Sequence, residues 1–456
     1  MEYLGIHYEM KNGPELDPGY IPFGIWAQAY GKDAKKPLAI AVEREDGRVT
    51  VRNTKIYGTP DMEEADYRYV ERYVKFLLWS VGGFKIYVCG CSKLAQRLAQ
   101  AYTPQGARAF DVQFMQDVYE KTVEVVDCAL EDCPKANESS LPIGGHMEGC
   151  RIGFDAGGSD RKVSAVVDGV PVYSEEVVWH PKTQSDPQYH FDGIVAAFKT
   201  AASKMPRVDA IGVSSAGVFI GNSPMVSSLF IKVPRERREE VKSIYDRAAA
   251  EIGVPIVVAN DGDVTALAGA MGLEDGCVMG MAMGTSEAVG YVDNDRNVLG
   301  WLNELAFAPV DLSEQAMQDE WSGDFGVGCK YFSQDAVIKL APAAGIDLPA
   351  DATPAEKLKL VQGLMADGDP RPVGIYKSIG AYLAYTVVQY SMFYDIRHLL
   401  VLGRVTSGEG GTLLLEECNR ILKAEFPELA AKVSVTLPDE KTRRVGQSVA
   451  AASLPA

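Results

Sequence analysis

Two adjacent glycines that follow an apolar run and an aspartate constrain the fold of this chain more than any other feature. The segment 152–159 is Ile-Gly-Phe-Asp-Ala-Gly-Gly-Ser, and another apolar stretch follows it. This pattern predicts a strand, a tight turn and a returning strand, with Asp155 at the end of the first strand. The backbone N–H groups of Gly157 and Gly158 can approach a phosphate closely, and Ser159 adds a hydroxyl. An ordinary hairpin turn is the alternative, because Gly-Gly is common in hairpins.

A second turn of the same kind lies downstream at Gly284, Thr285 and Ser286, again between an apolar run and a returning strand. Between the two turns, an apolar strand ends in Asn260 and Asp261, and a helix of small residues follows. A carboxylate at the end of a buried strand and the start of a helix is well placed to accept a proton from a hydroxyl. The spacing therefore favours Asp261 as a general base between two phosphate-binding turns.

A third glycine-containing turn follows the strand predicted at 398–402. Gly403 and Arg404 begin this turn, and a helix follows from Thr412. Such a turn suits contacts with adenosine and its α-phosphate, because a helix N-terminus favours anionic oxygen. At the first turn, Asp155 is placed to hold a magnesium ion or a water molecule on it.

Together these turns resemble those of the superfold shared by sugar kinases, actin and heat-shock chaperones. Within that superfold the chain resembles the ROK family of repressors, open reading frames and sugar kinases. The resemblance covers residues 150–456 and includes the phosphate hairpin, the Asn-Asp pair, the Gly-Thr turn and the segments around Glu304 and Cys329. It implies an α/β, actin-like (ribonuclease-H-like) ATPase fold that is duplicated into two lobes.

The resemblance also implies ATP-dependent phosphorylation of a sugar hydroxyl, with ATP and Mg²⁺ as cofactors. Asp261 would be the catalytic base. The sugar would be bound by Asn260, Glu304, Ser215 and Asn222, and Mg²⁺ would bind at Asp155 through water. The nucleotide would be bound by the following residues of the three turns: Asp155, Gly157, Gly158, Ser159, Gly284, Thr285, Ser286, Gly403 and Arg404.

The zinc motif of the family is degenerate in this chain. Phe307 occupies the histidine position, Ser322 and Asp324 occupy two cysteine positions, and only Cys329 remains. One thiolate cannot form a tetrahedral zinc site, so we predict no zinc there. Packing must then hold the loop, and the candidates are four aromatic residues: Trp321, Phe325, Tyr331 and Phe332.

The sugar-contacting positions of the family are also altered. Met225 replaces the amide of a Ser-Pro-Asn element, for which Asn222 is a candidate substitute, and Tyr331 stands in place of a sugar-binding glutamate. These changes predict a substrate other than plain glucose. The loop at 179–190, which contains two histidines, is either a saccharide-binding loop or a solvated surface loop.

The resemblance divides the chain into an extension, a linker and two lobes. We expect an N-terminal α/β extension at 1–132, a linker at 133–149, lobe one at 150–262 and lobe two at 263–443, with a C-terminal helix at 444–456 that returns to lobe one. Within the extension, hydrophobic spacing predicts strands at 37–42, 48–56 and 84–88 and helices at 65–81, 93–102 and 112–130. The extension is either a degenerate partial repeat of a lobe or a separate unit that packs on the kinase or forms a dimer contact.

Composition narrows the classes of partner and compartment. A net charge of −17 over 456 residues disfavours a nucleic-acid partner, which would need clustered Lys and Arg. The sequence begins with no secretory signal, in which basic residues precede an apolar stretch, and it has no apolar run long enough to span a bilayer. We therefore expect a cytoplasmic protein with no membrane partner. We expect the eight cysteines to be buried free thiols, because disulfides are rare in a reducing cytosol. The resemblance further implies a homodimer.

Two alternatives to a sugar kinase stay open. A non-catalytic sugar or sugar-phosphate sensor would explain the altered sugar positions, but a pure sensor has no need of both a magnesium carboxylate and a base. An ATPase activator of the same superfold would need an iron–sulfur cluster, and no cysteine pair is placed to suggest one. We therefore expect an ATP-dependent sugar kinase that binds a small sugar and a nucleotide.

Overall fold

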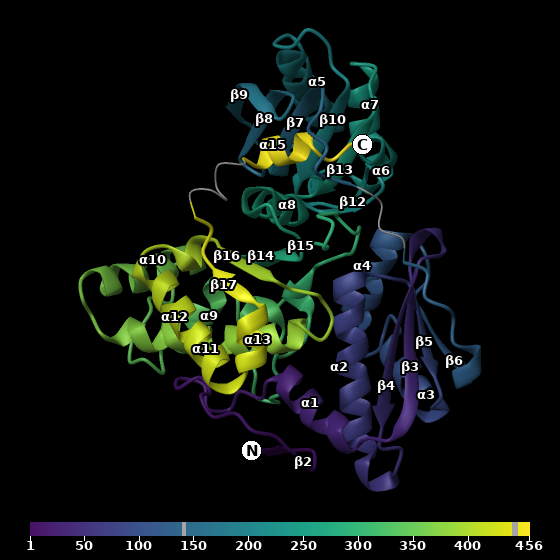
Figure 1. Ribbon diagram of the computed structural model, residues 1–456, viewed down its shortest axis with the longest axis vertical. Helices are drawn as coiled ribbons and strands as arrows, with labels where there is room; N and C mark the ends of the chain where they lie inside the picture. The colour runs from purple at the N-terminus through teal and green to yellow at the C-terminus, as the bar shows by residue number, and fades with distance from the viewer. Residues whose placement is uncertain (139–142, 440–445) are drawn as a thin grey trace.

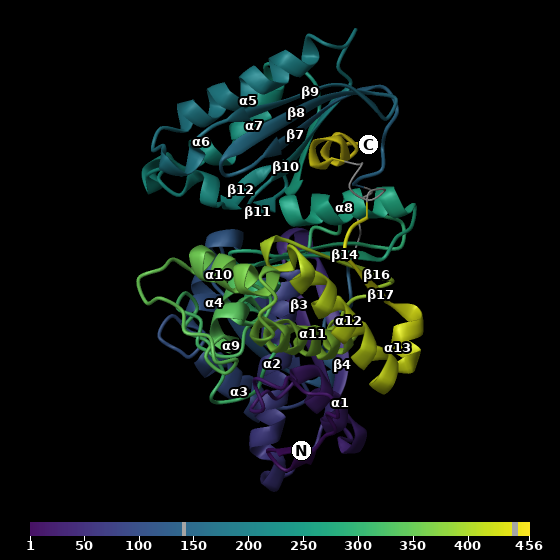
Figure 2. The same cartoon turned by 90° about the vertical axis from the view of Figure 1, so that its left-hand side faces the viewer.

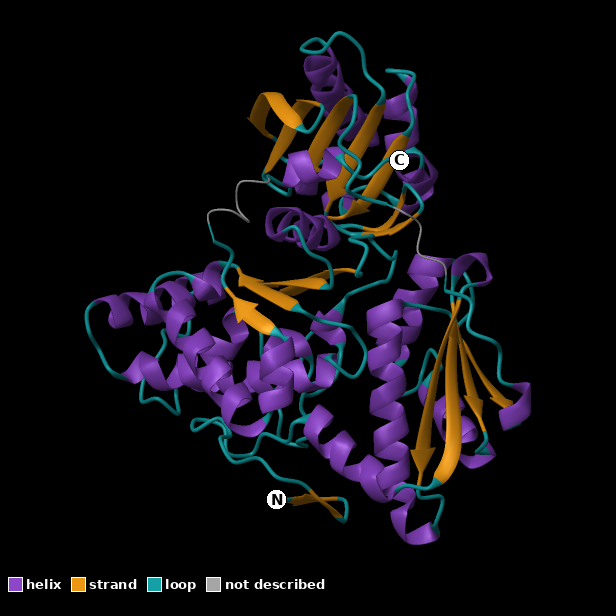
Figure 3. Cartoon of the chain, viewed as in Figure 1, coloured by secondary structure: helices purple, strands orange, loops and turns teal. Residues whose placement is uncertain are grey.

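The computed structural model describes residues 1–138, 143–439 and 446–456. Its framework is three main sheets, one in the N-terminal extension and one in each of two lobes (Figures 1 and 3). In Figure 1 lobe one lies above lobe two, and the extension lies beside lobe two. The predicted linker at 133–149 lies partly outside the described residues.

Lobe one is a five-stranded sheet flanked by helices. Its elements are β7 (Cys150–Ala156), β8 (Asp160–Val167), β9 (Val170–Val178), α5 (Pro187–Ala202), β10 (Ala210–Ser215), β11 (Val218–Ile220), β12 (Ser223–Val226), α6 (Arg238–Lys242), α7 (Ile244–Ala250) and β13 (Ile256–Asn260). The sheet order is β13-β10-β7-β8-β9, in which β7 to β9 are antiparallel neighbours and β10 and β13 run parallel to β7. Both faces of β7 and β10 are buried, which explains their nearly continuous apolar sequences.

Lobe two repeats the strand pattern of lobe one. Its elements are α8 (Asp261–Leu273), β14 (Val278–Met283), β15 (Glu287–Val292), α9 (Gln334–Leu340), α10 (Pro354–Ala366), α11 (Arg371–Tyr390), β16 (His398–Leu402), α12 (Glu409–Glu425), α13 (Pro427–Lys432) and β17 (Ser434–Thr436). β14 and β15 form an antiparallel hairpin, and β16 and β17 run parallel to β14. The order β17-β16-β14-β15 therefore matches β13-β10-β7-β8, and the expected duplicated fold is confirmed.

The extension has a sheet of its own in the order β4-β3-β5-β6. Its elements are β1 (Glu2–Tyr3), β2 (Ile6–His7), α1 (Phe23–Asp33), β3 (Lys36–Glu43), β4 (Val49–Ile56), α2 (Glu63–Val81), β5 (Lys85–Cys89), α3 (Ser92–Ala101), α4 (Ala109–Tyr119) and β6 (Glu124–Cys128). The predicted strands and the first two predicted helices are present at these positions. The strand pairing differs from that of the lobes, because β3 is antiparallel to β5 whereas β7 is parallel to β10.

The long helix predicted at 112–130 is wrong. The helix α4 ends at Tyr119, and Glu120 adopts a left-handed conformation with φ 53°. The β-branched residues Val125 and Val126 then form β6, which pairs in parallel with β5. The apolar spacing of this segment therefore comes from two elements rather than one.

The extension packs against both lobes. Its apolar residues and those of lobe two form one hydrophobic core. The rings of Phe76 and Tyr73, both on α2, lie 4.1 Å and 4.9 Å from the ring of Phe393 between centroids. The helix α4 also contacts the β11–β12 ribbon of lobe one, and Glu120, which follows α4, forms an ion pair with Lys242 at the end of α6.

The C-terminal helix α15 (Gln447–Ala452) lies against β7 and β10 of lobe one (Figure 2). A Cβ atom on Gly153 would lie 1.6 Å from the carbonyl oxygen of Ser448, and one on Gly212 would lie 1.7 Å from that of Ala451. Only glycine permits this close approach of helix and sheet. The described part of the tail therefore lies on lobe one, and residues 444 and 445 of the predicted helix lie outside the described residues.

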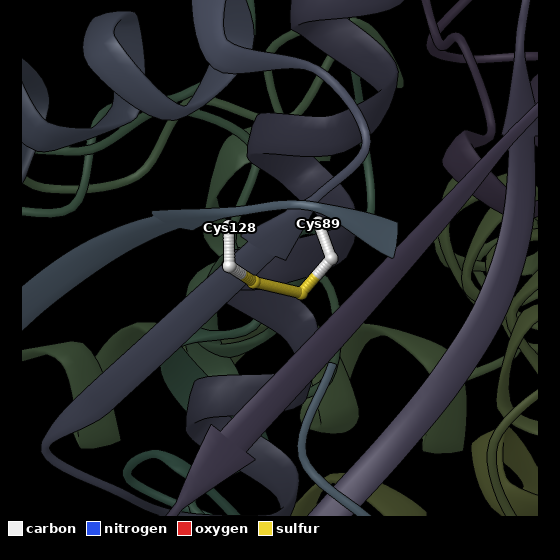
Figure 4. The surroundings of a disulfide bond; sticks show 2 residues. All are labelled: Cys89 and Cys128. Carbon is white, nitrogen blue, oxygen red and sulfur yellow. A yellow bond between two sulfur atoms is a disulfide. The ribbon is translucent and has the colours of Figure 1, made fainter. Parts of the chain in front are cut away.

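The expectation of eight free thiols is wrong for one pair. Cys89 and Cys128 end the neighbouring strands β5 and β6 in register, with Cα atoms 4.7 Å apart, and they form a disulfide (Figure 4). The other six cysteines are free. Within the described ranges, every helix is too short or too polar to cross a bilayer.

Candidate nucleotide and sugar site

The first predicted phosphate turn is the loop of the β7–β8 hairpin. Asp155 lies near the end of β7, and its carboxylate accepts a hydrogen bond from the Ser214 hydroxyl at 3.0 Å. Burial raises the pKa of Asp155 to about 6, and this hydrogen bond acts in the opposite direction. Gly157 and Gly158 are half-buried, and Ser159 is exposed. The hairpin therefore presents backbone N–H groups and a hydroxyl beside a carboxylate.

The second and third turns are joined to each other. Thr285 and Ser286 are exposed at the tip of the β14–β15 hairpin, where the N–H of Gly284 donates to the carbonyl of Ser286 at 3.0 Å. The guanidinium of Arg404 donates to the hydroxyl of Thr285. Gly403 has φ 105°, and a Cβ atom there would lie 2.4 Å from the carbonyl oxygen of Met283, so a side chain would not fit. The structure therefore brings these predicted nucleotide residues together.

Asp261 is the first residue of α8, which lies between the two lobes (Figure 2). The Asn260 carboxamide caps this helix by accepting from the N–H of Gly262 at 2.7 Å, and its Nδ2 donates to the carbonyl of Gly217 at 2.7 Å. Burial raises the pKa of Asp261, and the ammonium of Lys182 acts in the opposite direction. The predicted base is thus held by a helix cap at the junction of the lobes.

Gln447 is a site residue that the sequence analysis missed. From α15, its Nε2 donates to the Ser214 hydroxyl at 2.9 Å and to the carbonyl of Asp261 at 2.7 Å. Its Oε1 accepts from the Thr265 hydroxyl at 2.9 Å. Gln447 also lines a cavity of 370 Å³ that is bounded by α8, the end of β16 and the turn at Gly403. This cavity adjoins the third predicted nucleotide turn.

Three further carboxylates belong to the same group as Asp261: Glu304 lies near Asp261 and Asp263, and Glu287 lies near Glu304. Burial, together with the negative charges of Asp261 and Asp263, raises the pKa of Glu304 to about 7. Burial raises the pKa of Asp263 to about 7 although it accepts hydrogen bonds from Asn303 and from the backbone. Burial raises the pKa of Glu287 to about 8. The predicted sugar residue Glu304 is therefore half-buried in an acidic group whose members Asp263 and Glu287 are buried.

The structure does not bring Ser215 or Asn222 into the site. The Ser215 side chain is fully buried, and its hydroxyl is bonded to the Tyr245 hydroxyl at 2.8 Å. The Asn222 carboxamide donates to Asp246 at 2.8 Å and accepts from the N–H of Val258 at 3.1 Å. Both polar groups are used in hydrogen bonds within lobe one, which disfavours these two residues as sugar contacts.

A second cavity, of 180 Å³, lies where the extension meets both lobes. Asn260 and Gly217 line it from lobe one, Asp263 and Trp301 from lobe two, and Arg48 from the extension. Cavities for drug-sized ligands usually measure about 300–1,000 Å³, so this one suits a smaller molecule. Because Asn260 precedes the predicted base, the extension forms part of the wall next to the site.

The degenerate zinc loop is held differently from the prediction. Trp321 and Phe325 are 77% and 44% exposed, whereas Tyr331 and Phe332 are buried. Phe307, at the position of the family's histidine, packs against aromatic rings of the extension: Trp79, Phe110 and Phe114. Apolar packing across the boundary with the extension therefore replaces part of the predicted packing within the loop.

Buried ion pairs also join this loop to the extension. The carboxylate of Asp324 lies 2.7 Å from Arg108, 3.1 Å from Arg72 and 3.3 Å from Lys75, all three of which belong to the extension. Lys75 also pairs with the buried Asp111 at 2.8 Å. Burial alone would raise the pKa of Asp324, but these cations outweigh it and lower the pKa to about 2. Asp324 is therefore a buried anion paired with three cations.

Comparison with known proteins identifies the fold. No family model matches the chain, and no curated protein matches it. Among solved structures, the chain is similar to the ROK hexokinase of Thermus thermophilus, with a TM-score of 0.51 and 15% identity over 67% of this chain and 97% of that one. It is equally similar, with a TM-score of 0.51 and 15% identity, to a ROK transcriptional regulator homologous to the E. coli MLC protein, over 68% of this chain and 79% of that one. The expected fold is confirmed, and about a third of the chain lies outside the match.

Proposed function

We propose that this chain, which has the fold of the ROK proteins, is an ATP-dependent sugar kinase. The observation that carries the proposal is the placement of Asp261, a partly buried carboxylate at the start of α8. Two equivalent hairpins with phosphate-type turns belong to the sheets on either side of it. A base beside two such turns suits phosphoryl transfer to a hydroxyl.

In this mechanism, the Asp261 carboxylate accepts the proton of the sugar hydroxyl as that oxygen attacks the γ-phosphorus of ATP. The new P–O bond forms as the bond from the γ-phosphorus to the β,γ-bridging oxygen breaks. The bridging oxygen keeps the electron pair and leaves as part of ADP. The turns at Gly157–Gly158 and Gly284–Thr285 hold the phosphates through N–H groups, so positioning and charge stabilisation provide most of the catalysis.

The residues present fit a magnesium ion. Asp155 supplies a carboxylate oxygen beside the phosphate hairpin, and the Ser214 hydroxyl orients it. Mg²⁺ prefers oxygen ligands and keeps several waters, so one carboxylate with phosphate oxygens suffices. Asp155 would hold the ion through water, and the ion when bound would neutralise phosphate charge.

The substrate in this proposal is a small sugar bound by Asn260 and Glu304, with Ser215 and Asn222 left out. Of the two proposed sugar-binding residues, Asn260 lines the 180 Å³ cavity, whose volume fits one monosaccharide better than a longer saccharide. Met225 and Tyr331, which stand where the family has sugar contacts, favour a modified sugar over plain glucose.

A kinase of this kind would act in the cytoplasm, where ATP is available, and as a homodimer.

A non-catalytic sugar sensor is the second candidate, because the ROK regulator is as similar to this chain as the hexokinase is. The experiment that separates the two measures ADP release from Mg-ATP across hexoses, amino sugars, N-acetyl sugars and disaccharides. Sugar-dependent release supports the kinase and identifies its substrate class. Sugar binding detected by calorimetry without ADP release from any sugar would contradict the kinase and support the sensor.

A further inference from the structure

The loop that follows β9 is built around the first phosphate hairpin. The indole N–H of Trp179 donates to the carbonyl of Gly157 at 2.7 Å, and its backbone N–H donates to the carbonyl of Ser159 at 3.1 Å. These two bonds fix the loop to both sides of the Gly-Gly turn. The loop at 179–190 is therefore attached to the phosphate hairpin through Trp179, and its alternatives of a saccharide-binding or a solvated loop stay predictions.

A buried histidine, His190, also anchors this loop. The Nε2 of His190, which is fully buried, lies 3.1 Å from the carbonyl oxygen of Pro181 and 3.0 Å from that of Leu229. Both partners are acceptors, so Nε2 carries a hydrogen. Pro181 directly precedes Lys182, so the backbone before Lys182 is held by His190 and by the bonds of Trp179.

Lys182 lies over the phosphate turn. A Cβ atom built on Gly158 would be 2.6 Å from Cε and 2.8 Å from Nζ of Lys182, so the end of this side chain touches the glycine. The same ammonium lowers the pKa of Asp261, which places its charge on the side of the base. The ammonium thus lies on the Gly-Gly turn of the first hairpin, within electrostatic reach of Asp261, and the mechanism requires the γ-phosphoryl group beside both of them.

Lys182 is also unpaired, unlike its basic neighbours. Lys162 on β8 pairs with Glu176 at 3.6 Å, and the guanidinium of Arg161 donates to the carbonyl of Gly193. Arg404 is bonded to Thr285. Among the residues that the structure describes, Lys182 forms no ion pair with a carboxylate, and its side chain is exposed. Lys182 therefore has a free ammonium beside the hairpin that an anionic ligand can bind.

We propose that Lys182 binds the γ-phosphoryl group of ATP between Gly158 and Asp261 and stabilises its charge during transfer. This assignment rests on the proposed kinase function. As the acceptor oxygen bonds to the γ-phosphorus and the bridging oxygen leaves with its electron pair, the ammonium keeps its proton and its hydrogen bond to a γ-phosphoryl oxygen. A charge-assisted bond of this kind suits a developing phosphoryl anion.

The test compares nucleotide affinities of the full chain by calorimetry, using ADP and a non-hydrolysable ATP analogue, each with Mg²⁺. We expect Lys182→Met to weaken analogue binding about 10- to 100-fold while ADP binding changes little, because only the analogue carries a γ-phosphoryl group. Lys182→Arg should recover much of the lost affinity. Lys199→Met, which removes an exposed lysine of α5 paired with Glu251, should leave both affinities unchanged.

Equal weakening of ADP and analogue binding by Lys182→Met would overturn the assignment, because it would indicate a structural role in the loop. Unchanged affinity for both would overturn it as well. Selective loss of analogue affinity in a chain that phosphorylates no sugar would support Lys182 as a γ-phosphoryl ligand while contradicting the kinase function. A wild-type chain that binds neither nucleotide would overturn both proposals.

Discussion

Asp324 of lobe two forms a buried ion pair with Arg108 of the extension across 2.7 Å. Asp324 stands at one of the three positions at which the sequence departs from the expected zinc motif. The extension thus attaches by charge to the loop that contains Asp324. The aromatic contacts of Phe307 with Trp79 lie beside this attachment.

We predict that Asp324→Asn lowers the free energy of unfolding by about 1.5–3 kcal/mol, because Arg72, Arg108 and Lys75 lose one buried anion while Glu71 and Asp111 remain to pair with them. Chemical denaturation measures this change. The matched control is Glu320→Gln in the same loop, since Glu320 is largely exposed and pairs with Lys330. The control should cost about 1 kcal/mol or less. Equal effects of the two substitutions would contradict the role of the buried cluster.

The same residue predicts a dependence of stability on pH. The pKa of Asp324 is about 2 in the folded chain and 3.8 for an ordinary aspartate. A depressed pKa gives stability that is complete above the ordinary value and is lost as pH falls toward the folded value. We therefore expect the stability difference between the wild type and Asp324→Asn to shrink between pH 4 and pH 2. A difference that stays constant over this window, measured by denaturation at each pH, would count against the assignment.

The rate of phosphoryl transfer should fall on acidification through the raised pKa of Asp261. The base works only when deprotonated, so activity is lost below its pKa, and burial moves that loss to a higher pH than an exposed aspartate would show. Lys182→Met removes a cation that lowers this pKa, so the acidic limb of the kcat/KM profile should move to higher pH. A limb that moves to lower pH, or does not move, would contradict the placement of Lys182 beside Asp261.

Cysteine labelling tests the disulfide. Alkylation of the denatured chain without reductant should modify six thiols, since Cys89 and Cys128 are joined. Reduction before alkylation should raise the number to the eight cysteines of the sequence. Mass spectrometry distinguishes the two results. Eight modified thiols without reductant would show that Cys89 and Cys128 are not joined.

Local signals predicted the parts of the site that lie on turns and strand ends. Gly157 and Gly158 marked the first hairpin, Gly284 marked the second, and the Asn260–Asp261 pair marked the start of a helix, because the physical reason for each residue lies within a few neighbours. The duplication of the strand pattern followed from the resemblance that these turns carried. The end of α4 at Tyr119 was missed because the apolar spacing continues across the turn into β6.

Contacts between distant segments could not be predicted in this way. Gln447 reaches Ser214 and Asp261 only because α15 returns to lobe one. Ser215 is a polar residue at the end of a strand, which made it a candidate, but its hydroxyl is bonded to the hydroxyl of Tyr245 inside lobe one. The disulfide depends on the register of β5 and β6. Each of these contacts is determined by tertiary packing that the local sequence does not specify.

The most direct test of the central claim measures transfer of the γ-phosphoryl group from Mg-ATP to a sugar by the wild type and by Asp261→Asn. The account predicts a phosphorylated sugar from the wild type and a turnover about 10²–10⁴-fold lower for the variant, with ATP binding preserved. Near-normal turnover of Asp261→Asn would contradict Asp261 as the base. Absence of a phosphorylated sugar from the wild type across the whole sugar panel would contradict the kinase itself.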